Sequence, residues 1–203
     1  MKKYAVLHEP GDIVTLAGTR FVVLDVERRG SLPDSLFLLA LESVGASEFG
    51  SSNNYAESDL KKAVDKWLED MGKRGLDNAK LIPREIDLTT LDGSGCYGKL
   101  SVKAAPLTLD EARKYADIIP NAERWCWLAT GWSGPSKSDG DLALYVFSNG
   151  EWGHYGCSGT GGIRPALKIP SDLLLDSADK PDLSEVPTDT LLEEIRRRVV
   201  DKA

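Results

Sequence analysis

His154 and Cys157, in the last third of the chain, are of the types that perform nucleophilic chemistry. A cysteine beside a histidine can act as nucleophile and base, but residues three apart on a strand point to opposite faces. The other cysteines, Cys96 and Cys126, are far from Cys157 along the chain, and the other histidine is His8. The spacing of these cysteines and histidines is not typical of a metal site. The sequence therefore predicts buried thiols, no metal, no cofactor and no catalytic residue. A Cys126–Cys157 disulfide is the alternative, which a reducing cytosol disfavours.

The glycine-rich stretch 159–162 is the second feature with a chemical interpretation. Its sequence, Gly-Thr-Gly-Gly, resembles a phosphate-binding loop. No Lys-Ser or Lys-Thr pair follows it, however, and Pro165 blocks the helix that such a loop precedes. We therefore expect no bound nucleotide phosphate at this stretch.

Aromatic side chains are concentrated in the same part of the chain, which holds four of the five tryptophans. Trp132 lies in a loop rich in Gly and Ser, and Trp152, His154 and Tyr155 adjoin a predicted hairpin. Aromatic groups with a polar atom bury a large area at low entropy cost, so they are favoured on recognition surfaces. We predict a ligand-binding groove formed by Trp132, Trp152, His154 and Tyr155. In the alternative, Trp132 only covers the edge of a sheet.

Four other residues are expected to have structural roles. Trp67 lies on the apolar stripe of a predicted helix, and Trp125 and Trp127 open a predicted strand. Arg164 precedes a proline, and we expect its guanidinium to pair with a buried carboxylate or with carbonyl groups and so to fix the last strand. Ligand binding is the alternative role of Arg164.

Positioning these residues requires an antiparallel platform. Aromatic and β-branched runs at 125–130, 142–147, 151–155 and 161–169 are separated by Gly, Asn and Pro, a pattern typical of strands and tight turns. Asn149-Gly150 predicts a two-residue type I′ turn, because such a turn needs positive φ at both central residues.

Two amphipathic helices are expected to support the platform. Ser58 is the predicted N-cap of the first, whose apolar residues recur at helical spacing as far as Met71. Thr108 and Glu111 form a capping box that opens the second helix, which is expected to end just before Pro120.

The first part of the chain predicts further strands, at 4–7, 13–16, 20–26 and 36–41. The last of these is a continuous apolar run, which is consistent with a strand covered on both faces. The intervening stretch 28–34 contains Gly, Ser and Pro and is predicted to be a loop.

Composition changes after the aromatic part. Residues 1–169 are predicted to form one domain, 170–187 a linker rich in Ser, Asp, Lys and Pro, and 188–203 a C-terminal helical tail. The tail carries a narrow apolar stripe, so it is expected to pack on the domain or on a second copy. A homo-oligomer formed through residues 188–203 is therefore a predicted assembly.

Charge and hydropathy exclude some classes of function. The net charge is −7, with 41% apolar and 28% charged residues, as in soluble globular proteins. A nonspecific nucleic-acid binder would carry a basic face, so we expect no nucleic-acid partner. No apolar run approaches the roughly 20 residues that span a bilayer, and the N-terminus does not resemble a signal peptide. We expect cytoplasmic synthesis and no membrane partner.

Several short motifs occur in an order that carries a family resemblance. They lie at 54–61, 107–112, 125–128 and 162–167, the last reading Gly-Ile-Arg-Pro-Ala-Leu. Together they make residues 20–169 resemble the DUF6273 family, found in gut bacteria and their phages. That family usually shows Trp-Trp-Leu-Arg-Ser where this chain has Trp-Cys-Trp-Leu-Ala-Thr, so the family's arginine is absent here.

The resemblance implies a C-type-lectin-like fold: an α+β domain with two helices packed on short antiparallel sheets, plus a C-terminal helix. The calcium-binding triplets of sugar-binding lectins, Glu-Pro-Asn, Gln-Pro-Asp and Trp-Asn-Asp, do not occur. The implied function is a non-catalytic module of phage or mobile-element origin, associated with virions, that binds a protein or carbohydrate. The alternatives are a structural assembly subunit oligomerising through the C-terminal helix, and an enzyme of the formylglycine-generating type with a metal at Cys126 or Cys157.

Overall fold

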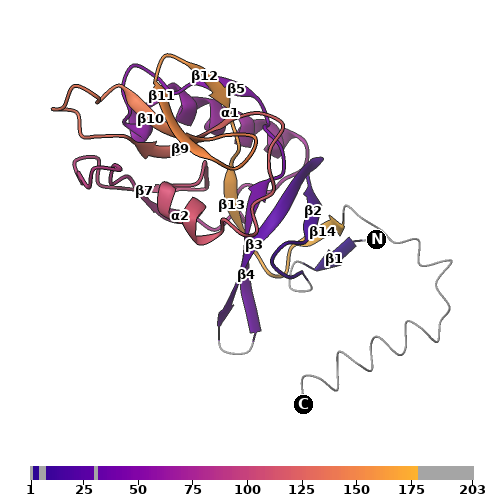
Figure 1. Cartoon of the computed structure of the whole chain (residues 1–203). Helices are drawn as coiled ribbons and strands as arrows, with labels where there is room; N and C mark the ends of the chain where they lie inside the picture. The colour runs from indigo at the N-terminus through magenta and orange to yellow at the C-terminus, as the bar shows by residue number, and fades with distance from the viewer. Residues whose placement is uncertain (1, 5–7, 30–31, 178–203) are drawn as a thin grey trace, which may run out of the picture.

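The computed structural model describes residues 2–4, 8–29 and 32–177 (Figure 1). Within these residues, two α-helices and a short 3₁₀ helix, η2 (Tyr55–Glu57), pack on two larger sheets and a two-stranded ribbon. The predicted class, α+β with two helices on antiparallel sheets, is confirmed at this level. The C-type-lectin-like assignment remains a prediction. No helix within the described residues is long and apolar enough to cross a bilayer.

The large sheet has the strand order β1-β14-β2-β3-β4-β13-β8, with every neighbouring pair antiparallel. Its strands are β1 (Lys2–Tyr4), β2 (Ile13–Leu16), β3 (Thr19–Arg29), β4 (Leu32–Ala40), β8 (Ala104–Ala105), β13 (Ala166–Pro170) and β14 (Leu174–Ser177). Strands β3 and β4 occupy its centre and extend beyond the body of the molecule as a long hairpin (Figure 1).

Both faces of β4 are buried, as the continuous apolar run predicted. Leu36 and Leu38 belong to an apolar cluster that also contains the buried side chains of helix α1 (Asp59–Lys73), here called the α1-side cluster. Phe37 and Leu39, which alternate with them, belong to a second cluster with helix α2 (Leu109–Lys114), here called the α2-side cluster. The large sheet therefore separates two cores.

The smaller sheet has the order β11-β10-β9-β12-β5, and its strands contain Trp127, Tyr145, Trp152 and Tyr155. Its strands are β5 (Ala46–Glu48), β9 (Cys126–Gly131), β10 (Leu142–Val146), β11 (Trp152–Gly156) and β12 (Thr160–Gly162). All its pairs are antiparallel except β9 with β12. The predicted antiparallel platform is therefore confirmed, with one parallel pair added.

The hairpin between β10 and β11 forms where it was predicted, but the prediction of a type I′ turn is wrong. The amide of Phe147 bonds the carbonyl of Glu151 at 2.7 Å, which leaves residues 148–150 as the loop. Within this loop only Gly150 has a positive φ, of 85°. A single left-handed glycine is typical of a three-residue loop, whereas type I′ would place Asn149 there as well.

The two helices begin where predicted. The Ser58 hydroxyl accepts the amide of Lys61 at 2.9 Å, and the capping box of Thr108 and Glu111 is complete. Helix α2 is shorter than expected, because Tyr115 leaves helical geometry (φ −110°, ψ 16°) and the chain continues as turns. The ribbon of β6 (Arg84–Asp87) and β7 (Lys99–Val102) lies between the helices in sequence.

Two predicted boundaries are wrong. The loop expected at 28–34 is part of the β3–β4 hairpin, which pairs as far as Arg29 with Leu32. The linker expected at 170–187 contains β14, which pairs with β1 and β2, so the folded sheet continues past residue 169. The predicted helical tail, residues 188–203, lies outside the described residues.

Candidate functional site

The predicted binding residues do not share one surface, because β11 alternates between the two faces of the smaller sheet. Trp152 pairs with Val146 and His154 pairs with Leu144, both in the α2-side cluster. Tyr155 pairs instead with Ala143, which belongs to the α1-side cluster. Successive strand residues point to opposite faces. The structure therefore brings Trp152 and His154 to the α2 face and places Tyr155 on the opposite face.

Trp132 joins the α2 face through His154. Their ring centroids are 4.0 Å apart with the planes 43° from parallel, and Trp132 is half-buried against the α2-side cluster. Three of the four predicted residues thus lie on one face. Trp132 packs against this apolar cluster and is only partly buried.

A cavity of about 380 Å³ opens on this same face. We call it the α2 cavity. Its walls come from α2 and the following turns (residues 112–122), from β9 and the end of β10, from the hairpin turn, and from Leu39, Leu107 and Arg164. Trp152 lines it, whereas Trp132 and His154 do not. Sequence patterns gave no indication of this cavity, because its walls are far apart along the chain.

Trp152 forms the outer rim of the α2 cavity, with 38% of its surface exposed. The guanidinium carbon of Arg113, on α2, lies 5.6 Å from the centre of its ring. A cation over an indole face is attracted by the ring's electron density. This contact links the hairpin to the helix across the mouth, so the aromatic rim is held in place by both walls.

Arg164 lines the α2 cavity and is only 7% exposed. Its Nε donates to the carbonyl of Ala40 at 2.7 Å, and its Nη2 donates to the carbonyl of Leu41 at 2.9 Å. These bonds join the segment before β13 to the end of β4. Arg164 therefore has the carbonyl partners that the sequence led us to expect.

Cys126 also lines the α2 cavity, and its thiol is not activated. Burial raises its pKa to about 11, despite the opposing effect of Arg164. Cys157 is buried in the α1-side cluster, and burial raises its pKa to about 12. Only the thiolate is a strong nucleophile, so both groups are neutral and unreactive near neutral pH.

All three cysteines are free in the structure, so the Cys126–Cys157 disulfide considered from the sequence does not form. His154 is exposed while Cys157 is buried in the α1-side cluster, which keeps them from acting as a pair. Among the described residues, no three His, Cys, Asp or Glu side chains are grouped as a metal site would require.

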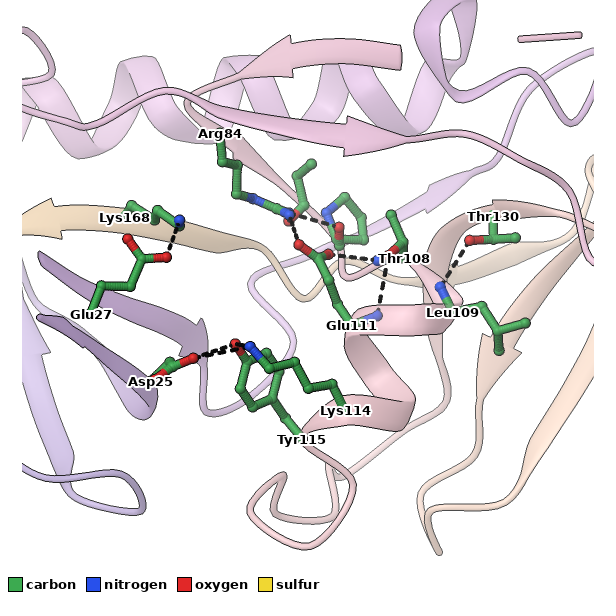
Figure 2. Close-up of polar contacts among 12 residues, drawn as sticks. Asp25, Glu27, Arg84, Thr108, Leu109, Glu111, Lys114, Tyr115, Thr130 and Lys168 are labelled. Carbon is green, nitrogen blue, oxygen red and sulfur yellow. Dashed lines mark hydrogen bonds and ion pairs between the residues drawn. The ribbon is translucent and has the colours of Figure 1, made fainter. Parts of the chain in front are cut away.

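Helix α2 is fixed as a cavity wall by a buried network at its N-terminus (Figure 2). Glu111 accepts the amide of Thr108 at 2.9 Å through one carboxylate oxygen and pairs with Arg84 through the other. Arg84 also donates to the carbonyls of Ala105 and Pro106, both at 3.0 Å. The cap of the helix is therefore connected to the β6–β7 ribbon and to β8.

Two further contacts anchor α2 to the sheets. The amide of Leu109 donates to the Thr130 hydroxyl of β9 at 2.9 Å. At the other end, the Tyr115 hydroxyl donates to Asp25 of β3 at 2.7 Å, and Lys114 lies 3.2 Å from the same carboxylate (Figure 2). The first turn of α2 is thus fastened to the smaller sheet and its last to the large sheet.

The opposite face of the smaller sheet carries aromatic rings packed on glycines. Tyr155 is 56% exposed, and its ring centroid lies 5.9 Å from that of Trp125. A Cβ at Gly161 would lie 2.3 Å from the Trp125 ring, and one at Gly159 would lie 2.3 Å from the Tyr155 ring. Only glycine fits at these two positions, because any Cβ would displace the rings.

The predicted structural tryptophans lie in or against the α1-side cluster. Trp127 is 1% exposed, and its Nε1 donates to the carbonyl of Ser47 at 3.0 Å. Trp125 is half-buried beside it, with ring centroids 4.9 Å apart. Trp67 of α1 is half-buried against the ring of Phe21.

Searches against models of protein families, curated proteins and solved structures return no significant match. The function proposed below therefore rests on the geometry of the α2 cavity and its surroundings.

Proposed function

We propose that this chain is a non-catalytic binding module whose ligand enters the α2 cavity past Trp152. The observation that carries the proposal is the cavity itself, about 380 Å³ in volume, with an exposed aromatic ring at its rim. Small-molecule sites are typically concave, mostly apolar pockets of roughly 300–1,000 Å³ with a few polar groups. Trp132 and His154 extend the same face beyond the cavity.

The chemistry around the cavity supports binding without catalysis. The nearest potential nucleophile is the Cys126 thiol, whose raised pKa keeps it protonated near neutral pH. The other lining side chains are apolar or are amides, apart from Glu151 at the hairpin and Arg164. The wider assignment to phages or mobile elements, with a protein or carbohydrate partner, rests on the family resemblance alone.

The proposal is tested with four small probes, hexanoate, hexanamide, phenylbutyrate and phenylbutyramide, observed by saturation-transfer NMR. Binding of one or more probes is expected, and Trp152→Ala should weaken it about tenfold because a central aromatic contact is lost. Ala116→Trp, which places an indole in the cavity wall from an exposed turn, should abolish it.

Tyr155→Ala is the matched control. It removes an exposed aromatic side chain from the same strand but from the opposite face, so probe binding should be unchanged. Urea unfolding of all three variants should stay within about 1 kcal/mol of the parent protein, as is usual for exposed positions. The proposal fails if no probe binds, or if Trp152→Ala and Tyr155→Ala weaken binding equally.

A further inference from the structure

The guanidinium of Arg164 has donors that the protein does not use. Nε and Nη2 each donate to one carbonyl, whereas Nη1 has no acceptor among the described residues. An arginine carries N–H groups on all three nitrogens and cannot be deprotonated in a protein. The unused N–H groups therefore belong to a permanent cation that forms part of the cavity wall.

Arg164 also has no carboxylate partner. No acidic side chain of the described residues lies within 4.0 Å of it, although Glu42 is near enough to influence it electrostatically. Cys126, the other ionisable group against it, is a neutral thiol near neutral pH. Buried charges in proteins are as a rule paired, because an isolated one is costly to desolvate. Arg164 is thus a buried cation that lines the cavity without an ion-pair partner among the described residues.

We infer that the α2 cavity binds a small carboxylate with an apolar body, its carboxylate on Arg164 and its body against Leu128, Val146 and Trp152. This inference rests on the proposed function and adds the class of ligand. The edge of the guanidinium formed by Nε and Nη2 is occupied by the carbonyls of Ala40 and Leu41. The end that carries Nη1 keeps parallel N–H groups, and these suit a carboxylate held by two hydrogen bonds.

Charge favours a carboxylate over a phosphate. One guanidinium neutralises one negative charge, and a phosphate dianion would bring a second charge into a cavity whose only lining cation is Arg164. Glu151 also lines the cavity and would repel a dianion more strongly than a monoanion. The chain as a whole carries a net charge of −7, which also disfavours a polyanion.

The test compares each acid with its neutral amide on the parent protein, by titration calorimetry at pH 7. Hexanoate and phenylbutyrate should each bind about tenfold more tightly than hexanamide and phenylbutyramide, since a charge-assisted pair adds about that much. Equal affinities of acid and amide would overturn the inference while leaving the proposed function standing. An aryl phosphate that binds more tightly than phenylbutyrate would also overturn it.

Two variants then test whether the preference for acid over amide comes from Arg164. Arg164→Met should reduce the preference for acid over amide to about one while the amide affinity is retained, and Arg164→Lys should keep part of the preference because the charge remains. Near-UV circular dichroism checks that each variant is folded. A preference that survives Arg164→Met in a folded protein contradicts the inference. The comparison on the parent protein stands even if the methionine variant does not fold. Absence of binding by all four probes would instead reject the proposed function.

Discussion

Two arginines are buried among the described residues, Arg84 and Arg164, and they differ in whether a carboxylate is paired with them. Arg84 is 4% exposed; it pairs with Glu111 and donates to two carbonyls. Arg164 is 7% exposed and donates to two carbonyls, but has no carboxylate partner among the described residues. Burial is therefore similar, and the counter-charge is what differs.

This difference distinguishes a structural cation from one that is available to a ligand. Arg84 lies at the N-terminus of α2, where Glu111 supplies its counter-charge (Figure 2). Its guanidinium carbon lies 5.2 Å from the centre of the Phe37 ring, and its Nε has no partner among the described residues. Arg164 lines the α2 cavity and has no carboxylate partner among the described residues. A buried ion pair is costly to break but adds little as a whole. The two arginines should therefore respond differently to the same substitution.

Arg84→Met is expected to have the largest effect on stability, about 3 kcal/mol. It leaves the Glu111 carboxylate and two buried carbonyls without their donor, and breaking a buried pair typically costs about 3–5 kcal/mol. The lower end applies because Glu111 is 24% exposed. Urea unfolding at pH 7 measures the change. Arg84→Met combined with Glu111→Gln should lose about 1–2 kcal/mol less than the sum of the single changes, since no uncompensated charge remains. Strict additivity would show that the pair is not coupled.

Arg164→Met is expected to cost less, about 1–2 kcal/mol in the same assay. Two buried carbonyls lose their donor, but no carboxylate is orphaned and a desolvated cation is removed. At equal concentration, hexanoate should stabilise the parent protein against urea more than it stabilises Arg164→Met, because ligand stabilisation follows the affinity for the folded state. A loss that equals or exceeds that of Arg84→Met would mean that Arg164 is as structural as Arg84, and the contrast between them would fall.

The sequence predicted the capping box, which is one half of the Arg84 network, and it did not predict the cavity. Thr108 and Glu111 are three residues apart, so their capping box is a local pattern that sequence alone indicates. The partner of Glu111, Arg84, lies 27 residues away, on a strand whose pairing is fixed only by the fold. For Arg164 the sequence predicted carbonyl partners, yet the cavity beside it depends on where α2 ends. At that end Tyr115 contacts Asp25, which is 90 residues distant.

The same limit explains the errors in the fold. The two-face burial of β4 was predicted because a continuous apolar run has a local signature. The turn at Asn149-Gly150 was assigned the wrong type, because several loop lengths accept that pair and strand register selects among them. The linker from residue 170 was inferred from Ser, Asp and Pro, although Leu173, Leu174 and Leu175 are an apolar run that β14 uses in part. The Tyr155 side chain was grouped with Trp152 by proximity in sequence, whereas alternation along β11 separates them.

Tyr115→Phe is expected to have the smallest effect on the free energy of unfolding. It tests whether the last turn of α2 is anchored to the large sheet. The ring contact with Phe37, at 5.7 Å between centroids, should remain, while the hydrogen bond to Asp25 and the one accepted from Lys114 are lost. Burial raises the pKa of Asp25, but the bonds from Tyr115 and Lys114 outweigh it and lower the pKa below its ordinary value of 3.8. A carboxyl whose pKa is lower in the folded state stabilises the fold above its unfolded pKa, and this contribution is lost as the pH falls through the folded value.

Tyr115→Phe should therefore lose about 0.5–1 kcal/mol at pH 7, the usual net value of one hydrogen bond reduced for partial exposure of Asp25. The difference from the parent should shrink as the pH is lowered below 3.8, where Asp25 becomes protonated. Urea unfolding at pH 7, 5 and about 3 follows this change. Tyr55→Phe is the matched control, because the buried Tyr55 hydroxyl has no partner among the described residues and its removal should not destabilise the fold at any of these pH values. A loss in Tyr115→Phe that is constant over the range would assign it to packing and would remove Asp25 as an anchor of the helix.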